Sequence, residues 1–163
     1  LLNGDRVLAN KMAARRNEIR RGEIYVFRPP GQRERMYIGR TIGLPGDTIG
    51  VRDNQVFVNG EKLEHTRVSR ESWESFGSQV TGEVLSESIS GHSHWVMLDE
   101  AADTVGDFAD TTVPDGTIFV LGDNRNRSRD SRSYGCVPLG DVVGPVHYIY
   151  WPAETWSRFG TAD

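Results

Sequence analysis

Short runs of β-branched and aromatic residues, separated by glycine and proline turns, dominate this sequence. Runs with the length and composition of strands lie at 6–10, 23–27, 36–42, 48–52, 55–59, 95–98, 117–120 and 141–151. The chain contains 18 Gly and 7 Pro, and turn sequences such as GLPGD at 43–47 and Asp53-Asn54 fall between the runs. Because almost no segment has the period of an amphipathic helix, we expect an all-β, mostly antiparallel fold.

The length of 163 residues suits one domain with a smaller subdomain. From 64 to about 91 the pattern weakens into Ser, Glu, Arg and Gly, so we expect at most short strands there, such as 83–86. Residues 99–112 are acidic and are predicted to form a loop with at most one helical turn. We therefore expect a β domain at 1–63 and 116–151, an inserted subdomain or long excursion at 64–115, and a C-terminal tail at 152–163.

Charge and cysteine content exclude several classes of protein. The net charge of −4 argues against a general nucleic-acid binder, and no run of about 18 apolar residues is present to span a membrane. Lys11 and Lys62 are the only lysines, and both lie in settings typical of exposed side chains. Cys136 has no partner for a disulfide and is expected to be a buried small hydrophobe. His92 and His94 lack further ligands nearby in the sequence, so no metal is expected.

The segment 121–138, LGDNRNRSRDSRSYGCVP, is the densest in charge and turn formers. Arg125 and Arg127 occupy positions where a calcium loop needs oxygen ligands, so that reading is excluded. The arginines are expected to pair with carboxylates rather than phosphates. No Gly-x-Ser-x-Gly elbow is present, and a Ser-Lys dyad needs a buried lysine that Lys11 and Lys62 do not offer. From composition alone, the segment is either a solvated surface or a rigid polar scaffold at the edge of a site.

Four motifs in order carry a resemblance to type I signal peptidases. GDNRNRSRDSRSYGCVP at 122–138 is similar to their Gly-Asp-Asn-Arg…Ser-x-Asp-Ser-Arg…Gly-x-Val-Pro signature. YIGRTIGLPGDTI at 37–49 resembles their Tyr-Ile-Lys-Arg-x-x-Gly-Leu-Pro-Gly-Asp segment. RGEIYVFRPP at 21–30 resembles their Gly-Asp-Ile-Val-Val-Phe type strand, and LNGDRVLANK at 2–11 resembles the segment after their catalytic Ser-Met-x-Pro-Thr.

The resemblance implies a serine endopeptidase that removes signal peptides from exported preproteins after an Ala-x-Ala-like site. It implies a signal-peptidase-like β domain on the extracytoplasmic (periplasmic) face of the bacterial inner membrane. The membrane anchor would lie in an N-terminal segment absent from this chain. The signal peptide would bind as an extended strand, and neither a cofactor nor a nucleic acid is implied.

The same motif match assigns roles to single residues. Ser128 falls on the serine that orients the general-base lysine, and Tyr37 and Ile38 fall on strand positions beside that base, where the substrate strand would bind. The supporting polar network of the family falls on Arg40, Asp123, Arg125, Asp130 and Arg132.

Two departures from the family pattern bear on activity. The serine nucleophile would lie a few residues before Leu1, and the general-base lysine falls on Gly39, which has no group to accept a proton. General-base assistance contributes about 10² to 10⁴-fold to rate, so we expect no peptidase activity from this chain. Our first hypothesis is therefore a member of this family whose base has been lost, by evolution or by engineering.

Three alternatives stand beside that reading. A naturally dead paralogue would act as a binding or assembly factor for exported or surface proteins. A working peptidase would use an unconventional base, and a soluble β domain would carry an inert Arg/Asp loop.

Overall fold

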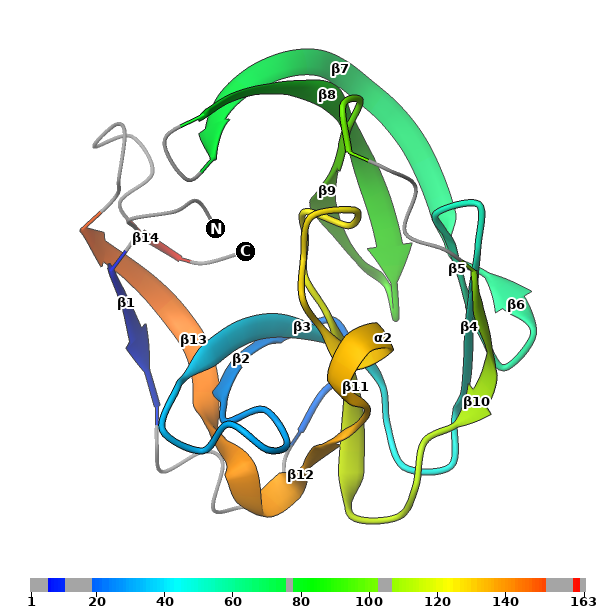
Figure 1. Ribbon diagram of the computed structural model, residues 1–163, viewed down its shortest axis with the longest axis vertical. Coiled ribbons are helices and arrows are strands. Elements are labelled where there is room, and N and C mark those ends of the chain that lie inside the picture. Colours follow the sequence, from blue (N-terminus) through cyan, green and yellow to red (C-terminus); the bar gives the residue numbers. More distant parts are fainter. Residues whose placement is uncertain (1–5, 11–18, 76–77, 103–106, 152–159, 162–163) are drawn as a thin grey trace.

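The computed structural model describes residues 6–10, 19–75, 78–102, 107–151 and 160–161. The predictions for Leu1, Lys11 and most of the tail at 152–163 therefore fall outside the described residues. Within them strands dominate, and helix is confined to α2 (Ser131–Tyr134) and the single 3-10 turn η1 (Leu139–Asp141). The predicted all-β fold is confirmed (Figure 1). Neither helix of the described part is long and apolar enough to cross a membrane.

The largest sheet collects strands from the beginning, middle and end of the chain. Its strand order is β1-β13-β2-β3-β11-β12, with β14 paired to β13, and all its pairs are antiparallel. The strands are β1 (Arg6–Ala9), β2 (Ile24–Phe27), β3 (Tyr37–Gly43), β11 (Thr117–Leu121), β12 (Val137–Pro138), β13 (Val142–Trp151) and β14 (Gly160–Thr161). This sheet places the two main sequence motifs, on β3 and after β11, side by side.

Two smaller antiparallel sheets complete the fold. One has the order β10-β4-β5-β6, and the other has the order β7-β8-β9, whose β7–β8 hairpin arches over the top of Figure 1. Their strands are β4 (Thr48–Arg52), β5 (Gln55–Val58), β6 (Glu61–Lys62), β7 (Glu64–Ser75), β8 (Ser78–Ile89), β9 (His92–Asp99) and β10 (Phe108–Thr112). The predicted tight hairpin at Asp53-Asn54 joins β4 to β5, with positive φ at both residues.

The segment 64–91 differs from its prediction, because β7 and β8 are strands of 12 residues each. Val80 and Val84 are buried on β8, but the buried positions then shift by one to Leu85, Glu87 and Ile89. The pairing with β7 is irregular at the same level, between residues 67 and 69. Such an irregularity turns the strand, so the simple alternation expected of a half-buried strand is broken in the sequence.

The prediction of a loop with a helical turn at 99–112 is also wrong for 108–112, which form β10 and pair with β4. Four of the five residues of β10 are exposed, so no apolar pattern marked this strand in the sequence. β10 lies in the predicted insertion and β4 in the predicted main domain. The division into domains remains a prediction.

Buried residues line both faces of the large sheet. Phe27 and Val120 belong to a cluster on the face toward which Gly39 points, whereas Ile42 and Leu121 belong to a second cluster on the other face. Cys136, predicted to be buried, is only half-buried against this second cluster, and burial raises the pKa of its thiol. Position 39 therefore faces one side of the sheet, and the side chain of Arg40 lies on the other side.

Candidate active site

Arg40 of β3 anchors the Arg/Asp loop (residues 122–132) to the large sheet. Its Nε and Nη2 donate to the two carboxylate oxygens of Asp123, each over 2.9 Å, and its Nη1 donates to the Gly22 carbonyl over 2.6 Å. Burial alone would raise the pKa of Asp123, but the hydrogen bonds and charge of Arg40 outweigh it and hold this pKa below its ordinary value. The pair is therefore charged at neutral pH and fixes β3 against the loop.

Asp130 organises the other end of the loop. It caps α2 by accepting from the Arg132 backbone N–H, and it accepts from Arg132 Nε and Nη2 over 2.8 and 2.6 Å. Its Oδ2 also accepts from the Gly122 N–H over 3.1 Å. The buried Ser131 hydroxyl accepts from the Val120 N–H, which joins α2 to β11. These contacts close the loop into one hydrogen-bonded unit.

Arg125 is 1% exposed and connects the loop to β8. Its Nη1 donates to Glu87 Oε2 over 2.7 Å, and its Nη2 donates to Glu87 Oε1. Its Nε donates to the Gly122 carbonyl over 3.2 Å, and Arg132 donates to the Arg125 carbonyl. Arg127 likewise pairs with Asp99. The prediction that loop arginines pair with carboxylates is confirmed for these residues.

Ser128 is in direct contact with Gly122. A Cβ atom added at Gly122 would lie 1.9 Å from Ser128 Oγ, so only glycine leaves room for this serine. The Ser128 hydroxyl donates to the Asn124 carbonyl over 2.5 Å. Its rotamer is therefore fixed from within the loop.

Gly39 is buried in β3, opposite Tyr25 of β2. A Cβ atom added there would lie 3.3 Å from the Leu121 carbonyl oxygen and 3.3 Å from Phe27 Cε1. Gly39 and Ser128 thus border the Leu121–Gly122 segment, one from β3 and the other from the loop. The structure brings the two predicted positions to the same segment, and position 39 contributes no proton acceptor.

Tyr37 and Ile38 point to opposite faces of β3. The Tyr37 ring packs edge-on against Tyr134 at a centroid distance of 6.1 Å, and its hydroxyl donates to Gln32. Ile38 is 44% exposed. Because β11 pairs with β3 only at residues 40–43, the segment 37–39 has a strand partner on one side only among the described residues. A shared role in strand binding therefore rests on their main-chain groups.

A carboxylate that the sequence analysis did not single out lies beside the loop. Glu87 is fully buried, with His65 Nε2 at 2.6 Å from Oε2 and His94 Nε2 at 3.1 Å from Oε1. Burial raises its pKa, but the hydrogen bonds of His65 and Arg125, the nearby His94 ring and the charge of Arg125 outweigh this and hold the pKa well below its ordinary value. Between Ser86 and Ser88 this residue has the sequence context of an exposed strand position, so no local pattern identified it.

The cluster around Glu87 is not arranged as a metal site. The Arg125 guanidinium already binds both carboxylate oxygens, and no group of three His, Cys, Asp or Glu in the described ranges fits a metal ion. The positive charge that a metal would supply comes from the arginine.

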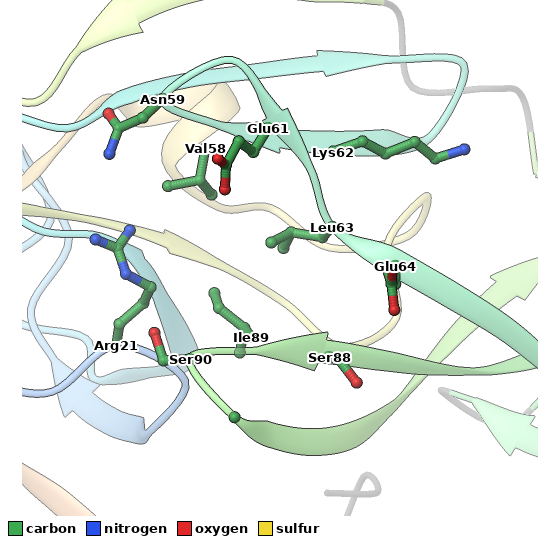
Figure 2. A pocket seen from close by; sticks show the side chains of 11 residues that line it. Arg21, Val58, Asn59, Glu61, Lys62, Leu63, Glu64, Ser88, Ile89 and Ser90 are labelled. Atoms are coloured by element: carbon green, nitrogen blue, oxygen red, sulfur yellow. The ribbon is translucent and has the colours of Figure 1, made fainter.

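The pocket in Figure 2, about 660 Å³ in volume, lies away from the loop. Its lining comes from Arg21 before β2, from the segment between the end of β5 and the start of β7, and from the end of β8 with the turn after it. It includes Asn59, Leu63 and Ile89. Arg21 is held by the Ile42 carbonyl and by Asp47, and the exposed Lys62 points away from the pocket. None of the predicted site residues lines this pocket, so it is a separate feature.

Comparison with known proteins identifies the family of this chain. The family described as signal peptidase, peptidase S26, matches residues 1–151. The chain belongs to this signal peptidase family. The family predicted from the four motifs is therefore confirmed.

Relatives of this signal peptidase family member cover most of its length. Signal peptidase I from Bacillus caldolyticus is 34% identical over 157 residues, which are 96% of this chain and 75% of that protein. Signal peptidase I from Rickettsia typhi is 35% identical over 148 residues, and the match covers 85% of this chain and 55% of that protein. A solved signal peptidase I from Enterococcus faecalis is 30% identical, with a TM-score of 0.46 over 79% of this chain and 97% of that chain.

Proposed function

We propose that this signal peptidase domain binds the signal peptides of exported preproteins as extended strands and does not cleave them. The observation that carries the proposal is Gly39, at the general-base position, with Phe27 and the Leu121 carbonyl around it. A serine hydroxyl is a weak nucleophile at neutral pH unless a base within hydrogen-bond reach takes its proton. In this proposal the nucleophile lies upstream of Leu1, and nothing at position 39 can activate it.

Strand binding is supported by the pairing of β3. The segment 37–39 pairs with β2 on one side only among the residues described, so its other side can accept a peptide backbone. Main-chain hydrogen bonds supply affinity in this mode, and shallow pockets select side chains. The exposed Ile38 gives the bound strand an apolar contact.

A second candidate is a naturally dead paralogue that acts as a binding or assembly factor for exported or surface proteins. It is favoured by the intact polar network between β3 and the loop, because the Arg40–Asp123 and Asp130–Arg132 pairs are formed. In both versions the domain lies on the extracytoplasmic face of the inner membrane, anchored by a segment that precedes this chain.

The test uses the full-length protein and a preprotein with an Ala-x-Ala site. We expect binding, measured by calorimetry with the signal peptide, and no cleavage on a gel. The matched control is the same peptide N-methylated at alternate residues, which removes strand hydrogen bonds and should bind about tenfold or more weakly. Cleavage by the protein with Gly39 in place would overturn the loss of activity. Equal binding of both peptides would overturn strand addition.

The two candidate functions differ in which part of the exported protein the domain binds. A domain that binds only signal peptides should not bind the mature part of the exported protein when that part is added without its signal peptide. An assembly factor should also bind the folded mature part, measured with the same calorimetric titration.

A further inference from the structure

We propose that Glu87 is a positioning residue of this site: from β8, it holds Arg125 and through it the Arg/Asp loop that carries Ser128. Glu87 belongs to the β7–β9 sheet, in the segment expected to be an insertion. The proposal gives that sheet a direct part in the geometry of the site. The proposal depends on the proposed function only in the experiment that measures peptide binding.

The Glu87 carboxylate is the centre of a buried cluster drawn from three strands and the loop. Arg125 approaches it with two nitrogens, while His65 from β7 and His94 from β9 approach one oxygen each. Glu87 is 0% and Arg125 1% exposed. A guanidinium this deeply buried needs a paired anion, because an uncompensated buried charge is strongly destabilising.

The edge of β9 fixes the loop backbone beside this cluster. The Met97 N–H donates to the Asp123 carbonyl over 2.8 Å, and the Arg125 N–H donates to the Met97 carbonyl over 2.9 Å. Farther along, Asn126 exchanges two hydrogen bonds with the Asp99 backbone. The loop therefore continues the β7–β9 sheet as a short parallel neighbour of β9.

Contacts within the loop transmit the position of Arg125 to Ser128. Arg125 Nε donates to the Gly122 carbonyl, and Gly122 is the residue against which Ser128 packs. Arg132 donates to the Arg125 carbonyl while paired with Asp130. A shift of Arg125 would thus displace both the serine and the segment that borders Gly39.

The experiment compares Glu87→Gln with Glu83→Gln by hydrogen exchange of the whole chain. Both changes neutralise a glutamate of β8, but Glu83 is 37% exposed and pairs with Arg67 at 3.2 Å on the surface. We expect amides of 122–132 to exchange about 100-fold faster in Glu87→Gln, because loss of the buried anion opens the loop. Exchange in β2 and β3 should stay near that of the parent, and Glu83→Gln should change neither region.

Two results would overturn the proposal. Unchanged exchange of 122–132 would mean that Glu87 does not hold the loop, and equal acceleration across all strands would mean that it only stabilises the core. If Glu87→Gln does not fold, Arg125→Lys gives the same comparison, because lysine keeps the charge but loses the two-point contact. Localised acceleration then supports the proposal, and uniform acceleration overturns it.

Peptide binding separates this proposal from the proposed function. Glu87→Gln should bind the signal peptide about tenfold more weakly than the parent, while Glu83→Gln should bind equally. If the parent does not bind the peptide at all, the proposed function fails, and localised exchange in 122–132 still supports the role of Glu87. If the parent binds and Glu87→Gln binds equally well, the positioning role fails.

Discussion

Arg40 and Asp123 are joined by two hydrogen bonds of equal length, 2.9 Å each, although they are separated by 83 positions in the sequence. Arg40 directly follows Gly39, and Asp123 directly follows Gly122. The pair therefore sets the register between the strand that carries Gly39 and the loop that carries Ser128. Arg40 is 6% exposed, so water does not compete effectively for its guanidinium.

Removing one member of this pair should strongly destabilise the fold. Asp123→Ala leaves the Arg40 guanidinium buried without its anion, at a cost of about 3 to 5 kcal/mol in the free energy of unfolding. Urea denaturation measures the difference. Arg33→Ala is the control, because Arg33 is 79% exposed and pairs with Asp141 at 3.5 Å, and it should cost less than about 0.5 kcal/mol. Equal effects of the two substitutions would contradict this account.

The contact between Gly122 and Ser128 predicts that the two positions are energetically coupled. Gly122→Ala should destabilise by about 1 to 3 kcal/mol, because the new methyl group overlaps the serine side chain. Adding Ser128→Gly removes the overlapping atoms and should recover most of the loss in a double-mutant cycle. Gly140→Ala is the control, since no atom lies within 4 Å of a Cβ at that position. Additive effects of the first two changes would show that they do not touch.

Asp47 should make stability depend on pH in the acid range. Burial raises the pKa of its carboxyl, but Arg21 at 2.7 Å, Asn59 and the Leu44 N–H outweigh this and lower it. A lowered pKa in the folded state means that the stabilisation is complete above the ordinary aspartate value of about 3.9. It is lost as pH falls toward the folded value.

The measurement for Asp47 is the unfolding free energy of the parent minus that of Asp47→Asn, from pH 7 to pH 2. We expect the difference to be constant down to about pH 5 and to shrink below about pH 4. Asp115→Asn, in an exposed turn, is the matched control. A difference that grows as the pH falls would show that folding raises the pKa of Asp47 instead of lowering it.

Local features of the sequence predicted the fold class and much of the strand pattern. Asp53-Asn54 and Pro45-Gly46 form turns because their backbones accept the required dihedral angles, with φ of 87° at Gly46. The family was predicted from four short motifs, each of which is contiguous in the sequence. Turns and contiguous motifs depend on residues that are close in the sequence, so the sequence alone is enough to find them.

The support from the β7–β9 sheet could not be predicted in the same way. Glu87 and Arg125 are 38 positions apart, and a glutamate between two serines has the pattern of a solvent-facing strand residue. The one-residue shift of buried positions at Val84 and Leu85 also hides the strand in the hydrophobic pattern. Only the tertiary contact between Glu87 of β8 and Arg125 of the loop accounts for this buried carboxylate.

The central claim concerns Gly39, and Gly39→Lys in the full-length protein tests it. A side chain at position 39 requires Phe27 and the Leu121 carbonyl to move away by a few tenths of an ångström. Gly39→Ala introduces the same Cβ atom without an amine, so it is the control for effects on folding. The measurement is the rate of preprotein cleavage. We predict no detectable cleavage by the parent or by Gly39→Ala, and a gain of about 10²-fold or more over the parent's background with lysine. Cleavage by the parent at the rate of the lysine variant would contradict the account.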